Sequence, residues 1–160
     1  MEDADAGKIA EIYNHYIAHS VITFEEVEVA APEILRRIEK TRHADHPWLV
    51  AEENQSLIGY AYACQWHERS AYRHTVEISI YLSHIVTGRG VGSALYKELF
   101  HQLSLRSVHV VIGGIALPNA ASAALHEKFG MKKVAHFDAV GYKFDQWIDV
   151  GYWQIVLGAG

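Results

Sequence analysis

Three glycines lie between an apolar strand pattern and a helical pattern, where they could bind phosphate. Gly88, Gly90 and Gly92 follow residues 76–82, in which apolar and polar residues alternate, and precede leucines at helical spacing. Glycine accepts positive φ, so such a turn can point several main-chain N–H groups at one place, with the positive end of the next helix behind them. The residue types therefore indicate a strand-to-helix turn that could hold a phosphate group.

Two well-known phosphate-binding motifs do not match this turn. A Walker A loop needs lysine and then serine or threonine after its last glycine, whereas Gly92 is followed by Ser93 and Ala94. A dinucleotide fingerprint needs a third glycine where Ser93 stands. It also needs an acidic residue at the end of the following strand, and none stands there at the usual distance. A flexible strand-to-helix loop without a ligand therefore stays open as the alternative at this point.

Length and composition limit the class of protein. The chain has 160 residues, half of them hydrophobic, a net charge of −5 and one cysteine, Cys64. We expect a single α/β domain over residues 1–160 without an internal disulfide. The basic residues are scattered, no apolar run has membrane-spanning length, and the N-terminal MEDADAGK has no apolar signal region. We therefore expect no nucleic-acid or membrane partner and a cytoplasmic location.

Changes in apolar periodicity predict the elements that position the turn. Helical spacing predicts helices over residues 9–17, over 32–38, after the glycine turn, and from Pro118-Asn119 to a left-handed cap at Gly130. Extended patterns predict strands at residues 48–53, 57–66, 75–82, 108–112, 133–142 and 150–157, and residues 23–29 also look extended. The strand and helix order from residue 75 to Gly130 predicts a crossover unit, and hence a mixed sheet.

Four phrases of the sequence resemble one enzyme superfamily. TVEISIYL, GRGVGSALY, LPNAASAALHEKFGM and GYKFDQWIDVGYWQ are similar to the GNAT superfamily of acetyl-CoA-dependent N-acetyltransferases, and most of all to its phosphinothricin (methionine sulfoximine) N-acetyltransferases. The resemblance covers nearly the whole chain. It implies a mixed, mostly antiparallel central sheet of six or seven strands flanked by about four helices, acetyl-CoA as cosubstrate, no metal, and a homodimer.

The resemblance also assigns the cofactor site. The turn would hold the pyrophosphate of coenzyme A, and the pantetheine arm would pair with the main chain of the preceding strand. The implied residues are Ile80, Tyr81, Leu82, Thr87, Gly88, Arg89, Gly90, Val91, Gly92, Ser93 and Asn119. Family members usually have an N-terminal strand before the first helix, and Gln or Arg where Thr87 stands. The sheet could therefore be one strand short, and Arg89 could replace the missing phosphate partner.

Glu77 is the candidate general base. An α-amino group is mostly protonated at neutral pH, and only its free lone pair can attack a thioester. Glu77 alternates in face with Val76 and Ile78, so its side chain points away from their layer. Its family counterpart is the proposed base, acting directly or through water; from the residues alone, an exposed strand carboxylate is the alternative. A backbone N–H near Ile80 could stabilise the oxyanion.

His126 is the second candidate for catalysis. It stands seven positions after Asn119, where superfamily members often have tyrosine and phosphinothricin-type enzymes have histidine. Its unperturbed pKa lies near ~6.5, so it could donate a proton to the departing thiolate or orient the substrate. A helix-surface histidine without a role is the alternative. No base is fixed beside Cys64 by sequence, which favours direct transfer in a ternary complex over a covalent route.

The acceptor residues are inferred from their chemistry. Arg73 is the best clamp for a carboxylate, because guanidinium pairs with it bidentately, and Phe24, Trp66 and Tyr72 could form the pocket walls. Core aromatics and a solvated arginine are the alternatives. The spacings of His15 with His19, and of His43 with His46, would suit a metal, but no Cys, Asp or Glu completes a ligand set in the sequence, so no metal site is expected.

The residues and the resemblance together predict an N-acetyltransferase. We expect it to move acetyl from acetyl-CoA to the α-amino group of a small amino acid or analogue, such as phosphinothricin, methionine sulfoximine or methionine sulfone. Two alternatives stay open. A protein or peptide N-acetyltransferase would have an open groove instead of a closed pocket, and a non-catalytic acyl-CoA-binding domain would bind the cofactor without releasing thiol.

Overall fold

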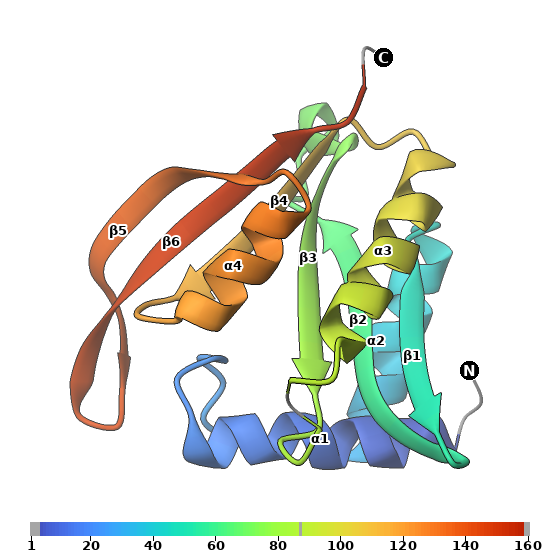
Figure 1. Ribbon diagram of the computed structural model, residues 1–160, viewed down its shortest axis with the longest axis vertical. Helices are drawn as coiled ribbons and strands as arrows, with labels where there is room; N and C mark the ends of the chain where they lie inside the picture. The colour runs from blue at the N-terminus through green and yellow to red at the C-terminus, as the bar shows by residue number, and fades with distance from the viewer. Residues whose placement is uncertain (1–3, 87, 159–160) are drawn as a thin grey trace.

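The computed structural model describes residues 4–86 and 88–158, in which a central sheet separates two layers of helices (Figure 1). The elements in chain order are α1 Asp5–His19, α2 Ala31–His43, β1 Trp48–Glu53, β2 Ser56–Gln65, the 3-10 turn η1 Ser70–Tyr72, β3 Thr75–Leu82, α3 Val91–Ser104, β4 Val110–Ala116, α4 Ala120–Lys128, β5 Lys132–Lys143 and β6 Gln146–Val156. No helix among these residues is long and apolar enough to cross a bilayer.

Six strands form one sheet in the order β1-β2-β3-β4-β6-β5. Neighbouring strands are antiparallel except β3 and β4, which are parallel and joined by the crossover helix α3. The expected mixed sheet with about four helices is confirmed, at the lower of the two expected strand numbers. Over the described residues, no strand precedes α1.

The alternation of side chains along β3 produces two cores. Val76 and Ile78 face the layer of α3, where Leu99 is fully buried, whereas Tyr81 packs with the cluster that contains Ile9 of α1. Each fully buried aliphatic side chain of this kind contributes roughly 1.5–3 kcal/mol through the area it removes from water. The sheet is therefore held from both faces, and β3 lies at its centre.

Strands β3 and β4 are paired at one end only. Their register runs from Thr75 with Val110 to Glu77 with Ile112 and stops there. Beyond Glu77, β3 continues to Leu82 with β2 on one side only, while β4 leaves with β6 and β5 (Figure 1). The edge of β3 that faces β4 is thus left without a strand partner over residues 78–82.

Three expected element positions are corrected by the structure. Residues 23–29 contain no strand; this loop returns to α1, where the side chain of Asn14 hydrogen-bonds both the N–H and the C=O of Val29 at 2.8 Å. Strand β4 begins at Val110, two residues late, and extends to Ala116 because β6 pairs with it along that length.

The start of β6 is the third correction. The strand begins at Gln146 and not at residue 150, because Phe144 and Asp145 both have positive φ, at 52° and 57°, and close a two-residue hairpin turn. Such turns normally use glycine or asparagine, so the sequence gives no signal for this one. The β5–β6 hairpin therefore extends further than the apolar pattern predicts, and projects from the rest of the sheet (Figure 1).

Candidate active site

A small cavity of about 60 Å³ lies where β3 and β4 part. Its walls come from four elements and the loop after α1, and comprise Ile22, residues 78–81 of β3, Tyr96, residues 114–116 of β4, Asn119, Ser122 and His126. Glu77 precedes these β3 residues directly. An extended ligand that lay along the unpaired edge of β3 would therefore end beside this cavity.

The three expected cofactor residues of β3 offer different groups. Ile80 and Tyr81 line the cavity, but the Tyr81 ring packs on the other face of the sheet, 5.1 Å from the Tyr13 ring. The main chain of Tyr81 is directed at β2, because Ser83, two residues on, donates to Ile58 of β2 in the same register. The carbonyl of Leu82 accepts a hydrogen bond from the Tyr16 hydroxyl. The open edge of β3 is thus left with the main-chain groups of Ile80 and the N–H of Leu82 to offer an extended ligand.

The glycine turn has the geometry expected of an anion-binding turn. Gly88 and Gly90 have φ of 73° and 75°, and Gly90 is the N-cap residue of α3. Nothing lies within 4 Å of the position that a Cβ would take at either glycine. A cavity of about 350 Å³ lies over the turn, between residues 88–93 and the helix α4. Thr87, an expected phosphate contact, lies outside the described residues.

Charge at this turn comes from a residue that the sequence reasoning missed. Lys128 of α4 lines the turn cavity and donates to the Ser93 hydroxyl at 2.9 Å. Arg89, expected as the phosphate partner, also lines this cavity, and its guanidinium forms two hydrogen bonds with Glu53 of β1, at 2.8 and 3.1 Å. Lys128 could not be found by spacing, because its approach to Ser93 depends on how α4 packs beside α3.

Glu77 is half-buried and has no hydrogen-bond or ion-pair partner among the described residues. It stands opposite Cys64 in the β2 register, and its Oε1 would be 3.3 Å from a Cβ at Gly114. Burial raises the pKa of this carboxyl group. The exposed-carboxylate alternative is therefore wrong, and the raised pKa makes this carboxylate more basic than that of an exposed glutamate.

His126 is buried, with 3% of its surface exposed, which excludes the helix-surface alternative. Its Nδ1 lies 2.7 Å from the carbonyl oxygen of Ser122, and its Nε2 lies 3.2 Å from the hydroxyl of Tyr96. Because a carbonyl only accepts, Nδ1 carries the hydrogen and Nε2 accepts from Tyr96. Burial lowers the pKa of His126, which favours this neutral form. A side chain at Gly113 would fill the imidazole's place, since its Cβ would lie 2.6 Å from the ring.

Tyr96 is the second residue that the sequence reasoning missed. It is fully buried on α3 and lines the small cavity beside His126. In the sequence, Tyr96 falls on the apolar face of the helical pattern and therefore looks like a core residue. Only its hydroxyl group could have indicated a functional role. Asn119 also lines the cavity, but its Oδ1 accepts from the N–H of Ser122 at 3.1 Å and caps α4.

The four expected acceptor residues do not meet in one place. The rings of Trp66 and Tyr72 both contact His67, with centroids 4.5 and 5.3 Å away. Arg73 is exposed and its guanidinium bonds the carbonyl of Ser70. None of the three lines the cavity between β3 and β4.

Phe24 lies elsewhere, against the β5–β6 hairpin. A Cβ at Gly141 would be 2.4 Å from its ring, so glycine is needed there for this contact. Ile22, two residues earlier, reaches the cavity between β3 and β4. A further ring, Tyr152 of β6, was not singled out from the sequence; it meets Trp66 edge-on at 5.4 Å and approaches Gly114 beside Glu77.

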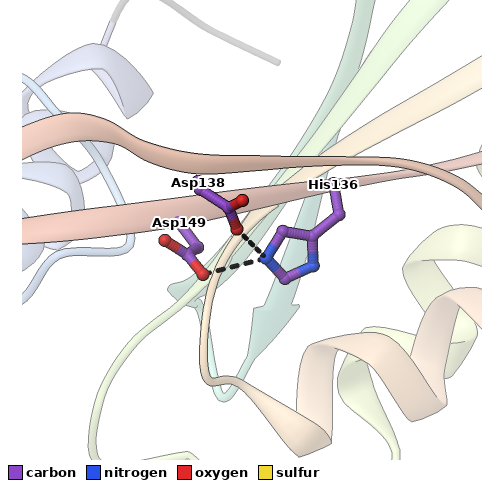
Figure 2. Close-up of side chains that lie close together, drawn as sticks. All are labelled: His136, Asp138 and Asp149. Atoms are coloured by element: carbon purple, nitrogen blue, oxygen red, sulfur yellow. Dashed lines mark hydrogen bonds and ion pairs between the residues drawn. The ribbon is translucent and has the colours of Figure 1, made fainter.

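Figure 2 shows a polar cluster on the β5–β6 hairpin, where Asp138 and Asp149 point at one nitrogen of His136. One imidazole nitrogen of His136 and one carboxylate oxygen each of Asp138 and Asp149 lie within 4.8 Å of one another. Lys133 lies 2.8 Å from Nδ1 of His136, Nε2 lies 2.8 Å from Asp149, and the N–H of Ala139 donates to the other oxygen of Asp149 at 2.7 Å. This network fastens the bulge that interrupts the β5–β6 register between Phe137 and Gly141.

Known proteins were compared with the sequence and the fold. The family described as "Acetyltransferase (GNAT) domain" matches residues 1–151. Phosphinothricin N-acetyltransferase of Streptomyces viridochromogenes is 38% identical over 151 residues, which cover 94% of this chain and 82% of the relative. The L-methionine sulfoximine/L-methionine sulfone acetyltransferase of Salmonella typhimurium is 34% identical over 156 residues, covering 98% of this chain and 91% of the relative.

Solved structures agree with these sequence relatives. An acetyltransferase of Salmonella typhimurium, solved with its cofactor acetyl-CoA, superposes with a TM-score of 0.97 at 33% identity, covering 100% of this chain and 92% of that one. A phosphinothricin acetyltransferase of Sinorhizobium meliloti in complex with acetyl-CoA gives a TM-score of 0.96 at 35% identity, covering 100% and 87%. The chain belongs to the GNAT family of acetyltransferases.

Proposed function

We propose that this enzyme acetylates the α-amino group of a small amino acid or analogue, with phosphinothricin, methionine sulfoximine and methionine sulfone as the first acceptors to test. The names of the relatives support this choice of acceptors. The observation that carries the proposal is the arrangement along β3. The strand bears a half-buried, unpaired Glu77 where β4 leaves it, and from there an open edge leads to the glycine turn.

The residues present fit acetyl-CoA, which supplies an acetyl thioester to the reaction. The turn cavity has room for a diphosphate, and the N-terminus of α3 and Lys128 offer donors and positive charge to it. The main-chain groups of Ile80 and the N–H of Leu82 lie on the edge of β3 without a strand partner, where they can pair with the amides of an extended arm. An N–H of the same edge can donate to the acyl oxygen as negative charge builds there.

Glu77 then removes a proton from the acceptor ammonium, directly or through water. The raised pKa makes it a stronger base than an exposed glutamate, and its carboxylate has no competing partner among the described residues. On the leaving side, the Tyr96 hydroxyl lies beside His126 and carries a single hydrogen, which it donates to Nε2 of His126. The hydroxyl can donate to the departing sulfur by turning this hydrogen from Nε2 to the thiolate, which breaks its bond to His126.

Cys64 is unsuited to a covalent route. Burial, with the neighbouring Glu77 as a smaller cause, raises the pKa of its thiol to about 11. A thiol with this pKa is neutral at physiological pH, and the thiolate is the nucleophile. We therefore favour direct attack of the amine in a ternary complex.

We also propose that the protein is a cytoplasmic homodimer. The β5–β6 hairpin exposes large apolar side chains, with Val140 at 60% and Trp147 at 71% of their surface accessible, beside Phe137, Tyr142 and Phe144. Such a patch is typical of protein interfaces. Light scattering of the full chain should give twice the monomer mass, and Trp147→Lys should give the monomer; a monomeric wild-type protein at micromolar concentration would contradict the proposal.

The acceptor panel tests the activity itself. Purified protein with acetyl-CoA should release thiol with phosphinothricin or methionine sulfone, and Glu77→Gln should reduce that rate about a hundredfold. Turnover of peptide N-termini without turnover of free amino acids would favour the protein-acetylating alternative. Calorimetric binding of coenzyme A without thiol release from any amine would favour the non-catalytic one.

A further inference from the structure

A cavity of about 460 Å³ lies between α2 and β2, and we call it the α2 cavity. Its walls include Lys40 and Thr41 of α2, the rings of Trp48, Tyr62 and Trp66, and the thiol residue Cys64. It shares no lining residue with the cavity between β3 and β4 or with the turn cavity. Its volume is in the range of sites that hold small molecules.

The α2 cavity is positively charged in a protein whose net charge is −5. Arg36, Arg37 and Lys40 lie on its wall, against the single carboxylate of Glu68. Both arginines are already paired, since each bonds Glu33 and Arg37 also bonds Glu25. Lys40 has no hydrogen-bond or ion-pair partner among the described residues. The cavity therefore has one cation left for an anionic ligand.

Two ring nitrogens on the wall also lack partners. The indole Nε1 of Trp48 and the Nδ1 of His46 are buried and make no hydrogen bond. Trp48 is 91% buried, since 9% of its surface is exposed, and its ring stacks on Tyr62 with centroids 4.2 Å apart. A buried N–H without an acceptor is unfavourable. Because this nitrogen is closed to solvent, a ligand oxygen supplies the acceptor only when the side chains around Nε1 move apart on binding.

We propose that the α2 cavity binds a small organic acid with a flat apolar body, such as an aryl-substituted acetate. The carboxylate pairs with Lys40 and accepts from the indole N–H of Trp48. The apolar body lies against Trp66 and Tyr62, which form the aromatic part of the wall. The charge, the unpaired donor and the aromatic surface are all satisfied by this one class of ligand.

The α2 cavity adjoins the candidate base, and its wall includes Trp66, one of the four expected acceptor residues. Cys64, on its wall, is the cross-strand neighbour of Glu77 and lies on the same face of the sheet. A ligand in the α2 cavity would therefore cover the β2 side of the base. The binding proposal stands independently of the acceptor, because no step above requires that the protein acetylate anything.

Calorimetry with phenylacetate as the probe tests the site on the full-length protein. Wild-type protein should bind it with a Kd of about 1 mM or tighter, and uncharged 2-phenylacetamide at least roughly tenfold more weakly. Lys40→Met should weaken phenylacetate binding about tenfold. Trp48→Phe keeps the ring stack on Tyr62 but removes the N–H, and should also weaken binding. The matched control is Lys97→Met. Lys97 is an exposed lysine of α3 that lines none of these cavities, so this variant should bind phenylacetate like wild type.

Several outcomes would overturn the proposal. Wild-type protein that does not bind phenylacetate contradicts it, as does unchanged binding in Lys40→Met or equal binding of the acid and the amide. Competition by coenzyme A would place the probe at the turn cavity, and competition by methionine sulfone would place it in the acceptor site. Circular dichroism of each variant separates loss of binding from loss of folding. A protein without acetyltransferase activity that still binds phenylacetate through Lys40 would leave this site standing.

Discussion

The hydroxyl of Tyr96 donates to Nε2 of His126 at 3.2 Å, and the two rings meet edge-on with centroids 5.3 Å apart. The other ring nitrogen of His126 donates to the Ser122 carbonyl, so the neutral imidazole has no hydrogen left to give. Of the two roles that the sequence left open for His126, the hydrogen bonds favour orientation. Tyr96 becomes the candidate donor to the leaving thiolate, provided that its hydroxyl hydrogen turns from Nε2 to the sulfur.

Replacing Tyr96 with Phe should lower kcat about a hundredfold, with little change in the KM of either substrate. The phenyl ring keeps the packing against His126, and only the donor is lost. Tyr60→Phe removes another buried hydroxyl, one that does not line the cavity, and should keep its activity. Steady-state kinetics of both variants provide the measurement, and equal rates in the two would contradict the role of Tyr96.

Glu77→Gln should remove the acidic limb of the pH profile. Activity needs the carboxylate, so kcat/KM of the wild type should rise as pH increases through the pKa of Glu77, which burial places above its ordinary value of 4.5. Glu52 is an exposed glutamate of β1, and Glu52→Gln should retain the wild-type profile. If kcat/KM of Glu77→Gln still fell at low pH as it does in the wild type, a group other than Glu77 would be responsible for that ionisation.

The same substitution should raise stability at neutral pH. A carboxyl whose folded pKa is raised binds more protons in the folded state than in the unfolded state, so it costs stability as pH rises from the unfolded pKa through the folded one. Glutamine carries no charge and removes that cost. Thermal melts at pH 4 and pH 7 should show the gain at the higher pH only; a gain of equal size at both would refute the electrostatic cause.

Lys128→Met should raise the KM for acetyl-CoA about tenfold and reduce its dependence on salt, with kcat nearly unchanged. The ammonium lies at the rim of the turn cavity, where it can meet phosphate but not the reacting carbonyl. Lys132→Met, an exposed lysine at the start of β5, serves as the control. A fall in kcat alone would show that Lys128 acts elsewhere.

Gly90→Ala should weaken acetyl-CoA binding and cost about 1 kcal/mol of stability, because φ at this N-cap is 75°. Gly7→Ala is a matched substitution at an exposed position of α1 without positive φ or a close neighbour. It should gain about 0.5 kcal/mol instead. Chemical denaturation of both variants measures the change in the free energy of unfolding, which should fall in Gly90→Ala and rise in Gly7→Ala.

The sequence predicted the centre of the molecule better than its ends. The bounds of β1 and β3 were correct, and the Asn119 cap and the left-handed Gly130 were found, because alternation and capping are local properties. The β5–β6 turn was missed because Phe144 and Asp145 adopt positive φ that their side chains do not favour. There the pairing of the two long strands decides the backbone conformation.

Among the site residues, too, those marked by local sequence patterns were predicted, and those positioned by tertiary packing were not. Glu77, His126 and the glycines were identified from strand phase and from the resemblance. The structure places Glu77 on β3, the glycines in and just after the turn that follows β3, and His126 on α4. Lys128 could not be foreseen, since its position beside Ser93 is set by packing between helices distant in sequence. The pairing of Arg89 with Glu53 was hidden for the same reason. Which residues bind the acceptor stays a prediction.

The bare edge of β3 has a consequence for the purified protein. Unpaired main-chain groups at a strand edge are the places where sheets of separate molecules join and precipitate. A cosubstrate lying along residues 78–82 would occupy the same groups, so adding coenzyme A should keep concentrated samples clear for longer during storage. The amides of that segment should also exchange their hydrogens for deuterium more slowly once the edge is covered.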